Sequence, residues 1–186
     1  GNKFLSHIRE VDAIVEVVRC FDDENITHVT GATNPLNDME IINIELILAD
    51  LEVVTNRIGK IEKKAATTKD KDVIFELKTL NKAKTALENN TPLRLVNFDK
   101  EELLALKNFS FLTLKPVIYV ANVDEETIVI GDNNYTLEVK KKAEADKFAR
   151  QQQSEAELYE MLCPTSLKSK NIMHEKVLQV MDLVKK

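Results

Sequence analysis

The stretch Lys115-Pro-Val-Ile-Tyr-Val-Ala-Asn-Val-Asp-Glu125 decides the fold of this chain. Val117–Val120 is a short apolar run of the kind found in strands that are buried on both faces of a parallel sheet. The run is followed by the polar residues Asn122 and Glu125. Because ligands bind beyond the carboxyl ends of strands in open α/β sheets, these two residues are candidates for binding. The alternative is that Asn122 and Asp124 only turn the chain, since Asn and Asp are common in turns.

Two helices with strongly periodic apolar residues precede this stretch. The first is predicted to be capped by Asn37, with Glu40 completing a capping box, and to run from about Asp38 to Ala65. The second is predicted over residues 70–88. Apolar residues recur in both at spacings of three and four, the pattern of an a/d seam. The seam consists of Ile44, Ile47, Leu51, Val54, Ile58, Ile61 and Ala65 in the first helix and Val73, Leu77, Leu80 and Leu87 in the second, where Lys84 also lies on it.

The short connection between these two helices predicts an antiparallel hairpin. A narrow apolar seam on two long neighbouring helices is typical of a coiled coil that projects from a body. The alternative interpretation is a pair of ordinary core helices.

Weaker patterns predict the remaining elements. A helix is expected over residues 2–10. A second buried strand is expected over residues 13–18, in which Glu16 is unusual and indicates a strand end or a locally wet face. Further helices are expected over residues 99–107 and 136–162, the latter ended by proline, which cannot continue a helix interior. A last amphipathic helix is expected over residues 171–186.

The composition excludes several classes of protein. Apolar residues make up 44% of the chain, and no apolar run approaches the ~20 residues of a membrane span, so we expect a cytoplasmic protein with no membrane partner. Cys20 and Cys163 are too few for a disulfide framework or a zinc site. His7, His28 and His174 have neither the spacing of metal ligands nor a paired nucleophile, so chemistry based on histidine is not expected.

Glycine usage limits how the chain could hold phosphate groups. The four glycines, at positions 1, 31, 59 and 131, are not spaced as Gly-x-x-x-x-Gly-Lys-Ser/Thr or Gly-x-Gly-x-x-Gly requires. No phosphate-binding loop is therefore predicted within this chain. Because the sequence begins at Gly1 rather than at a methionine, we expect a fragment or a trimmed chain.

Charge is distributed unevenly along the sequence. Residues 1–55 carry 3 basic and 11 acidic side chains, whereas residues 56–88 carry 9 basic and 5 acidic ones. A basic projection on an acidic body is a plausible footprint for RNA or a ribosomal surface, and no signal specific for DNA is present. The alternative is a solvated, lysine-rich helix face, because the segment lacks interleaved aromatic residues.

Several long and unusual blocks of residues follow one another in order between Gly1 and about Asp146. They are Gly1-Asn-Lys-Phe-Leu-Ser-His-Ile-Arg-Glu-Val-Asp12, Val17-Val-Arg-Cys-Phe21, Ile26-Thr-His-Val29, Glu45-Leu46, Leu48-Ala-Asp-Leu51, and Ser110-Phe-Leu-Thr-Leu-Lys-Pro116 through Asn122-Val-Asp-Glu125. Together these blocks resemble the YchF, or Obg-like ATPase, family.

The resemblance implies an α/β fold class, with a partial P-loop GTPase-like parallel sheet and an inserted antiparallel helical coiled-coil hairpin. Residues 1–36 and 91–146 map onto segments of the nucleotide domain, and the second of these carries the base-recognition strand. Residues 37–90 map onto the inserted hairpin. Residues 147–186 do not align and are expected to form an unassigned helical tail.

The resemblance also implies a function, the Mg²⁺-dependent hydrolysis of ATP by a ribosome-associated protein, with GTP as a further nucleotide. Related GTPases recognise guanine with Asn-Lys-x-Asp, whereas this family carries Asn-x-x-Glu, which maps onto Asn122 and Glu125 as nucleotide-binding residues. No catalytic or metal-binding residue maps onto the chain. The expected partner is the ribosome, through its large subunit, or RNA, bound by the hairpin.

The chain departs from the family pattern in two ways that affect function. Glu16 stands where the family more often has His, and the phosphate loop and Mg²⁺-binding positions fall before Gly1. We therefore expect a fragment of a YchF-type ATPase that is inactive by itself. The alternative is a non-enzymatic helical-hairpin module that binds RNA, ribosome or protein. A Gly-x-x-x-x-Gly-Lys-Ser/Thr motif encoded upstream would favour the first hypothesis over the second.

Overall fold

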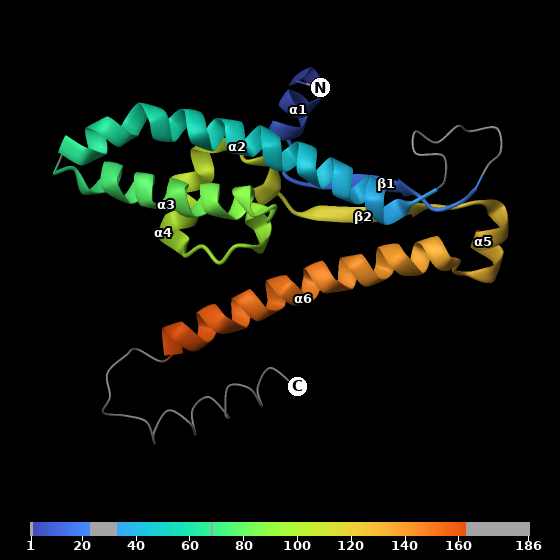
Figure 1. The fold of residues 1–186 in the computed structure, drawn as a ribbon. Coiled ribbons are helices and arrows are strands. Elements are labelled where there is room, and N and C mark those ends of the chain that lie inside the picture. The colour runs from blue at the N-terminus through green and yellow to red at the C-terminus, as the bar shows by residue number, and fades with distance from the viewer. Residues whose placement is uncertain (1, 23–32, 68, 163–186) are drawn as a thin grey trace.

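The computed structural model describes residues 2–22, 33–67 and 69–162, and for residues 2–3 and 152–162 it describes the backbone only. The predicted helix over residues 171–186 lies outside the described residues. Within them the chain forms a two-stranded parallel sheet and is otherwise mostly helical (Figure 1). The elements in chain order are α1 (Asn2–Arg9), β1 (Ile14–Arg19), α2 (Pro35–Thr67), α3 (Lys71–Glu88), η1 (Leu93–Leu95), α4 (Lys100–Leu106), η2 (Lys107–Phe109), η3 (Leu112–Leu114), β2 (Val117–Asn122), α5 (Glu125–Ile130) and α6 (Asn134–Leu162).

The sheet confirms the predicted α/β class. β1 and β2 pair in parallel, with Ile14 opposite Val117 at one end and Arg19 opposite Asn122 at the other. The amino ends of both strands therefore meet at one edge, here called the amino edge, and their carboxyl ends meet at the carboxyl edge. At the carboxyl edge the Cys20 N–H donates to the Asn122 carbonyl oxygen at 2.8 Å, which continues the pairing one residue beyond β1.

The described residues cover one face of the sheet and leave the other open. On the covered face Val18 and Cys20 pack against Met39 of α2 and Val139 of α6, and all four side chains are buried. The opposite face carries Val15, Val17, Ile118 and Val120, whose side chains are between 42% and 65% exposed. The prediction that Val117–Val120 is buried on both faces is therefore wrong for this structure, because nothing among the described residues covers the second face.

The caps of α2 and α3 explain where these helices begin. The Asn34 side chain accepts a hydrogen bond from the Asn37 N–H at 3.1 Å, and Pro35 occupies the first helical position, where no N–H donor is needed. The predicted cap at Asn37 is wrong, because Asn34 caps the helix and Asn37 lies within α2. Asp70 caps α3 by accepting from the Asp72 and Val73 N–H groups, close to the predicted start.

α2 and α3 lie side by side and are called the helical pair (Figure 1). Most of the predicted seam is buried, but Ile44 is 37% exposed and Ala83 rather than Lys84 faces the core. Lys84 instead lies 3.6 Å from Glu88 on the same helix. The segment that follows α3 adds Leu93, Phe98, Leu106 and Phe111 to the same core. The base of the pair is therefore part of a larger packed unit.

None of the described helices combines the length and the apolar character that crossing a bilayer requires.

Candidate functional site

The carboxyl edge of the sheet holds the residues that the sequence singled out. β2 ends at Asn122 and α5 begins at Glu125, and both side chains are exposed. Neither side chain forms a hydrogen bond within the part of the chain that the structure describes. The local fold therefore leaves both groups available to a ligand.

The residue that turns the chain at this edge is Asp124. Its carboxylate accepts a hydrogen bond from the Thr127 N–H at 2.8 Å and so caps α5. Hydrogen bonds from the side chain and backbone of Thr127 lower the pKa of Asp124. The turn hypothesis thus holds for Asp124, whereas the Asn122 side chain takes no part in the cap.

Asn133 fixes the loop between α5 and α6 to the end of β1. Its side-chain amide donates to the Cys20 carbonyl oxygen at 2.7 Å and to Thr127 Oγ1 at 3.1 Å. The Asn133 side chain also accepts from the Thr136 N–H, while Thr136 Oγ1 accepts from the Asn133 N–H, both at 2.9 Å. Sequence reasoning missed Asn133, although the Asn-x-x-Thr spacing ahead of a long helix resembles a capping box.

An open pocket of about 440 Å³ lies beside this loop, between the segment after β1 and the start of α6. The Tyr135 hydroxyl donates to Asp22 at 2.8 Å across it, and the Arg19 guanidinium lies 5.0 Å from the centre of the Phe21 ring. Hydrogen bonds, first from Thr33 and then from Tyr135, lower the pKa of Asp22. Neither Asn122 nor Glu125 is among the residues that line this pocket.

Glu16 lies on the covered face of the sheet, in the middle of β1 and opposite Tyr119. Burial raises its pKa from 4.5 to about 7, against the opposing positive charges of Arg94 and Lys142. The Tyr119 hydroxyl donates to Asp146 of α6 at 3.1 Å, so polar groups continue across this face. Glu16 was recognised as unusual in the sequence, and the reason is a polar layer between the sheet and the helices rather than a strand end.

The remaining candidate residues do not join the site. His7 is exposed on α1, while His28, His174 and Cys163 lie outside the described residues. Cys20 is fully buried, and burial raises the pKa of its thiol. Across residues 2–22, 33–67 and 69–162, no group of three His, Cys, Asp or Glu side chains is arranged to hold a metal ion.

An amide and a carboxylate together offer a defined chemistry. The Asn122 amide carries both a donor and an acceptor, and an ionised Glu125 only accepts. Such a pair suits the edge of a heterocyclic base, where donors and acceptors alternate. Neither group is suited to holding a triphosphate, because phosphate sites use backbone N–H groups and cationic side chains.

Comparisons with known proteins point to one family. The chain is 52% identical over 134 residues to the ribosome-binding ATPase YchF of Bacillus subtilis, a match that covers 72% of this chain and 36% of that protein. It is 47% identical over 146 residues to the protein of the same name from Haemophilus ducreyi, covering 78% of this chain and 39% of that protein. No protein-family model matches the chain.

A solved structure agrees with these matches. The Schizosaccharomyces pombe YchF GTPase has a TM-score of 0.70 and 28% sequence identity, and the alignment covers 96% of this chain and 48% of that one. The chain thus spans between 36% and 39% of the length of the two bacterial relatives. The chain corresponds to part of each relative.

Proposed function

Because this chain is a YchF homologue over 72% to 78% of its length, we propose that it supplies the base-binding edge and the helical arm of a ribosome-associated ATPase. The matched relatives carry the name ribosome-binding ATPase. The observation that carries the proposal is the carboxyl edge, where Asn122 and Glu125 remain exposed while Asp124 alone caps the helix.

Asn122 and Glu125 contact the base of ATP, or of GTP, in this proposal. The phosphates and Mg²⁺ are held by another part of the complete protein, since the chain has no glycine-rich loop and the described residues offer no metal site. Mg²⁺, when bound, neutralises charge on the phosphates. The 186-residue chain alone is accordingly expected to bind ATP weakly and not to hydrolyse it.

The helical pair is proposed to contact the ribosome, through its large subunit or through RNA. Basic groups nearer its base are already engaged, as Arg57 pairs with Glu76 at 2.6 Å and Lys82 with Glu102 at 2.6 Å. Lysines 60, 63 and 64 near the tip are exposed. The part of the pair beyond the shared core is proposed to act as a projecting coiled coil that carries these charges.

The ribosome proposal is tested by co-sedimentation with purified ribosomes at several salt concentrations. Replacing Lys60, Lys63 and Lys64 by Glu reverses three charges at the tip, and we expect weaker binding and a smaller dependence on salt, because fewer phosphates are neutralised. The control replaces three exposed lysines elsewhere, at positions 100, 107 and 141, by Glu. Equal loss of binding in both variants would mean that only net charge matters, and unchanged binding in the tip variant would refute the proposed contact.

A further inference from the structure

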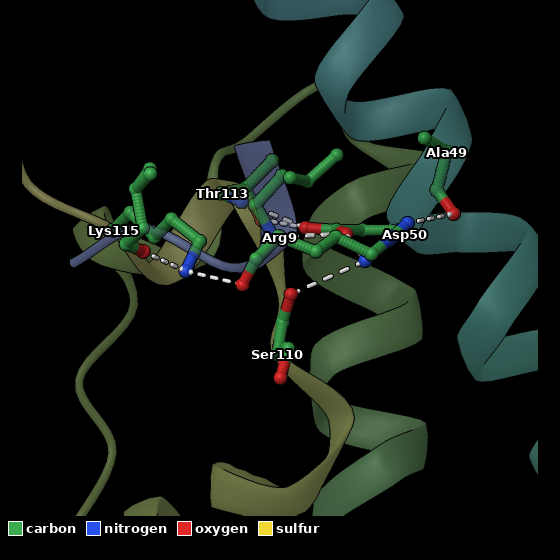
Figure 2. Close-up of polar contacts among 8 residues, drawn as sticks. Arg9, Ala49, Asp50, Ser110, Thr113 and Lys115 are labelled. Carbon is green, nitrogen blue, oxygen red and sulfur yellow. Dashed lines mark hydrogen bonds and ion pairs between the residues drawn. The ribbon is translucent and has the colours of Figure 1, made fainter. Parts of the chain in front are cut away.

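Asp50 is a fully buried carboxylate in the middle of α2. One oxygen accepts from the Leu112 N–H at 3.0 Å and from Arg9 Nη1 at 3.1 Å. The other accepts from the Thr113 N–H at 2.7 Å and from Thr113 Oγ1 at 2.8 Å. These four hydrogen bonds join α2 to α1 and to η3, two segments that are remote from it in the sequence (Figure 2).

The contacts of Arg9 and Lys115 extend this junction. Arg9, the last residue of α1, also donates to the carbonyl oxygens of Ser110 at 3.2 Å and Ala49 at 3.3 Å. Lys115 donates to the carbonyl oxygens of Arg9 and Val11, so it holds the chain between α1 and β1 (Figure 2). Each of the three segments is therefore bound to both of the others.

The junction lies at the amino edge of the sheet, where the Ile14 N–H donates to the Pro116 carbonyl oxygen at 2.9 Å. α2 passes through it as one uninterrupted helix of 33 residues. That length is roughly 50 Å at 1.5 Å per residue. Met39 near one end of α2 packs at the carboxyl edge of the sheet, and the exposed lysines lie near the other end. Asp50 thus fixes a single helix to the sheet between the candidate base site and the tip.

We propose that Asp50 couples three segments rigidly, so that the helical pair, α1 and residues 110–115 open and move together. This coupling is called the joint. A buried carboxylate is stable only while its donors stay in place, since each lost donor leaves part of the charge unsatisfied. Separating any one of the three segments weakens the others for that reason. One consequence rests on the proposed function. When the tip binds the ribosome, a movement of α2 is passed to the sheet through Asp50.

The joint is tested first on the free chain by hydrogen exchange with mass spectrometry. Thr113→Val removes one donor to Asp50 while keeping the shape of a buried side chain. The matched control is Thr79→Val, because Thr79 is also buried and its hydroxyl has no hydrogen-bond partner among the described residues. We expect Thr113→Val to speed exchange roughly tenfold or more in α1, in the middle of α2 and in residues 110–115, whereas the control changes none of them.

Arg9→Gln provides a second variant, since it removes the ion pair but leaves Asp50 with its three donors from residues 112 and 113. It should speed exchange in the same three segments. Faster exchange confined to the mutated segment in both variants would overturn the proposal, because it would show that the segments open independently.

A second measurement compares exchange in the free chain with that in the chain bound to purified ribosomes. The proposal expects changes both at the tip and in residues 110–117, and it expects the change in 110–117 to be lost in Thr113→Val while binding persists. Changes limited to the helical pair in the unmodified chain would refute transmission through the joint. If the chain does not sediment with ribosomes at all, the proposed ribosome contact fails, and the exchange pattern of the free chain still decides whether the joint exists.

Discussion

At the scale of single residues, neighbouring carboxylates at the carboxyl edge have different roles. Asp124 accepts from the Thr127 N–H and is committed to the helix cap, while Glu125 forms no hydrogen bond among the described residues. The Asp side chain is shorter than that of Glu, and its oxygens reach the backbone N–H groups in the first turn of the helix that it caps. Asp124 is therefore the structural carboxylate, and Glu125 is the carboxylate proposed to bind the base.

The proposed role of Glu125 predicts a change in base preference. Guanine presents two neighbouring donors to a carboxylate, whereas adenine has an acceptor at the ring nitrogen and lacks the second amine. In a full-length protein with this segment, Glu125→Asp is expected to shift the ratio of GTP to ATP affinity towards GTP. A net gain of one such hydrogen bond corresponds to a shift of roughly 10- to 100-fold, since a hydrogen bond to a charged group contributes about 1.5–3 kcal/mol.

Nucleotide titrations on parent and variant measure this ratio, with Glu126→Asp as the control at the exposed neighbouring position. An unchanged ratio would show that another part of the protein selects the base. Adding the lysine that related GTPases carry, through Val123→Lys, is a less clean test, because Val123 packs against the buried cluster of Val18 and Met39.

Glu16 predicts a dependence of stability on pH. Its pKa in the folded chain is about 7, against 4.5 as the ordinary value, so the folded state favours the protonated form. The stability that Glu16 contributes is therefore fully present below pH 4.5 and is lost as the pH rises through 7. We expect Glu16→Gln to be more stable than the parent at pH 8 and similar to it near pH 4.5. Urea denaturation across this pH range measures the free energy of unfolding of both proteins. If the two free energies differed by the same amount at every pH, the assigned pKa would be contradicted.

At the scale of elements, the helical pair was predictable because its apolar spacing is regular over many turns. The start of α2 was not, since Asn34 and Asn37 are both good caps and the sequence pattern favoured the one with Glu40 three residues later. The six-residue helix α5 has too few residues for a periodic pattern, so it was missed. Asp50 was missed for another reason, because its partners lie more than 40 residues away and an acidic residue in a helix is usually exposed.

The position of the α2 cap can be tested with two substitutions. Asn34→Ala removes the acceptor for the Asn37 N–H and is expected to lower the free energy of unfolding by about 1 kcal/mol. Asn37→Ala is expected to have little effect or a slight stabilising one, since residue 37 lies within the helix and alanine is a better helix former. Chemical denaturation distinguishes them, and the reverse order of effects would restore the cap predicted from the sequence.

At the scale of the whole molecule, the α/β class could be predicted from one strand, whereas the binding site at the carboxyl end of that strand stays a prediction. The sequence did not predict that residues 93–111 would share a core with the helical pair, because that packing depends on side chains brought together only by the fold. The assignment of residues 91–146 to a nucleotide domain and of 147–186 to a separate tail stays a prediction. Among the described residues, α6 continues through position 147 without interruption.

The open face of the sheet has a consequence for how the isolated chain behaves in solution. Within the part of the chain that the structure describes, each strand pairs with one neighbour, so each has an outer edge with no strand beside it, next to exposed Val15, Val17, Ile118 and Val120. Such an edge is a template for strand addition by another molecule. Concentrated solutions of the chain are therefore expected to aggregate through intermolecular β-pairing.

Val17→Lys places a charge on that face and is expected to delay aggregation, as followed by light scattering and thioflavin fluorescence. Leu104→Lys is the control, because Leu104 is 69% exposed on α4 rather than on the sheet. Equal protection by both substitutions would mean that added charge, not the strand edge, controls solubility. If Val17→Lys delays aggregation and Leu104→Lys does not, the uncovered sheet is the cause of the aggregation.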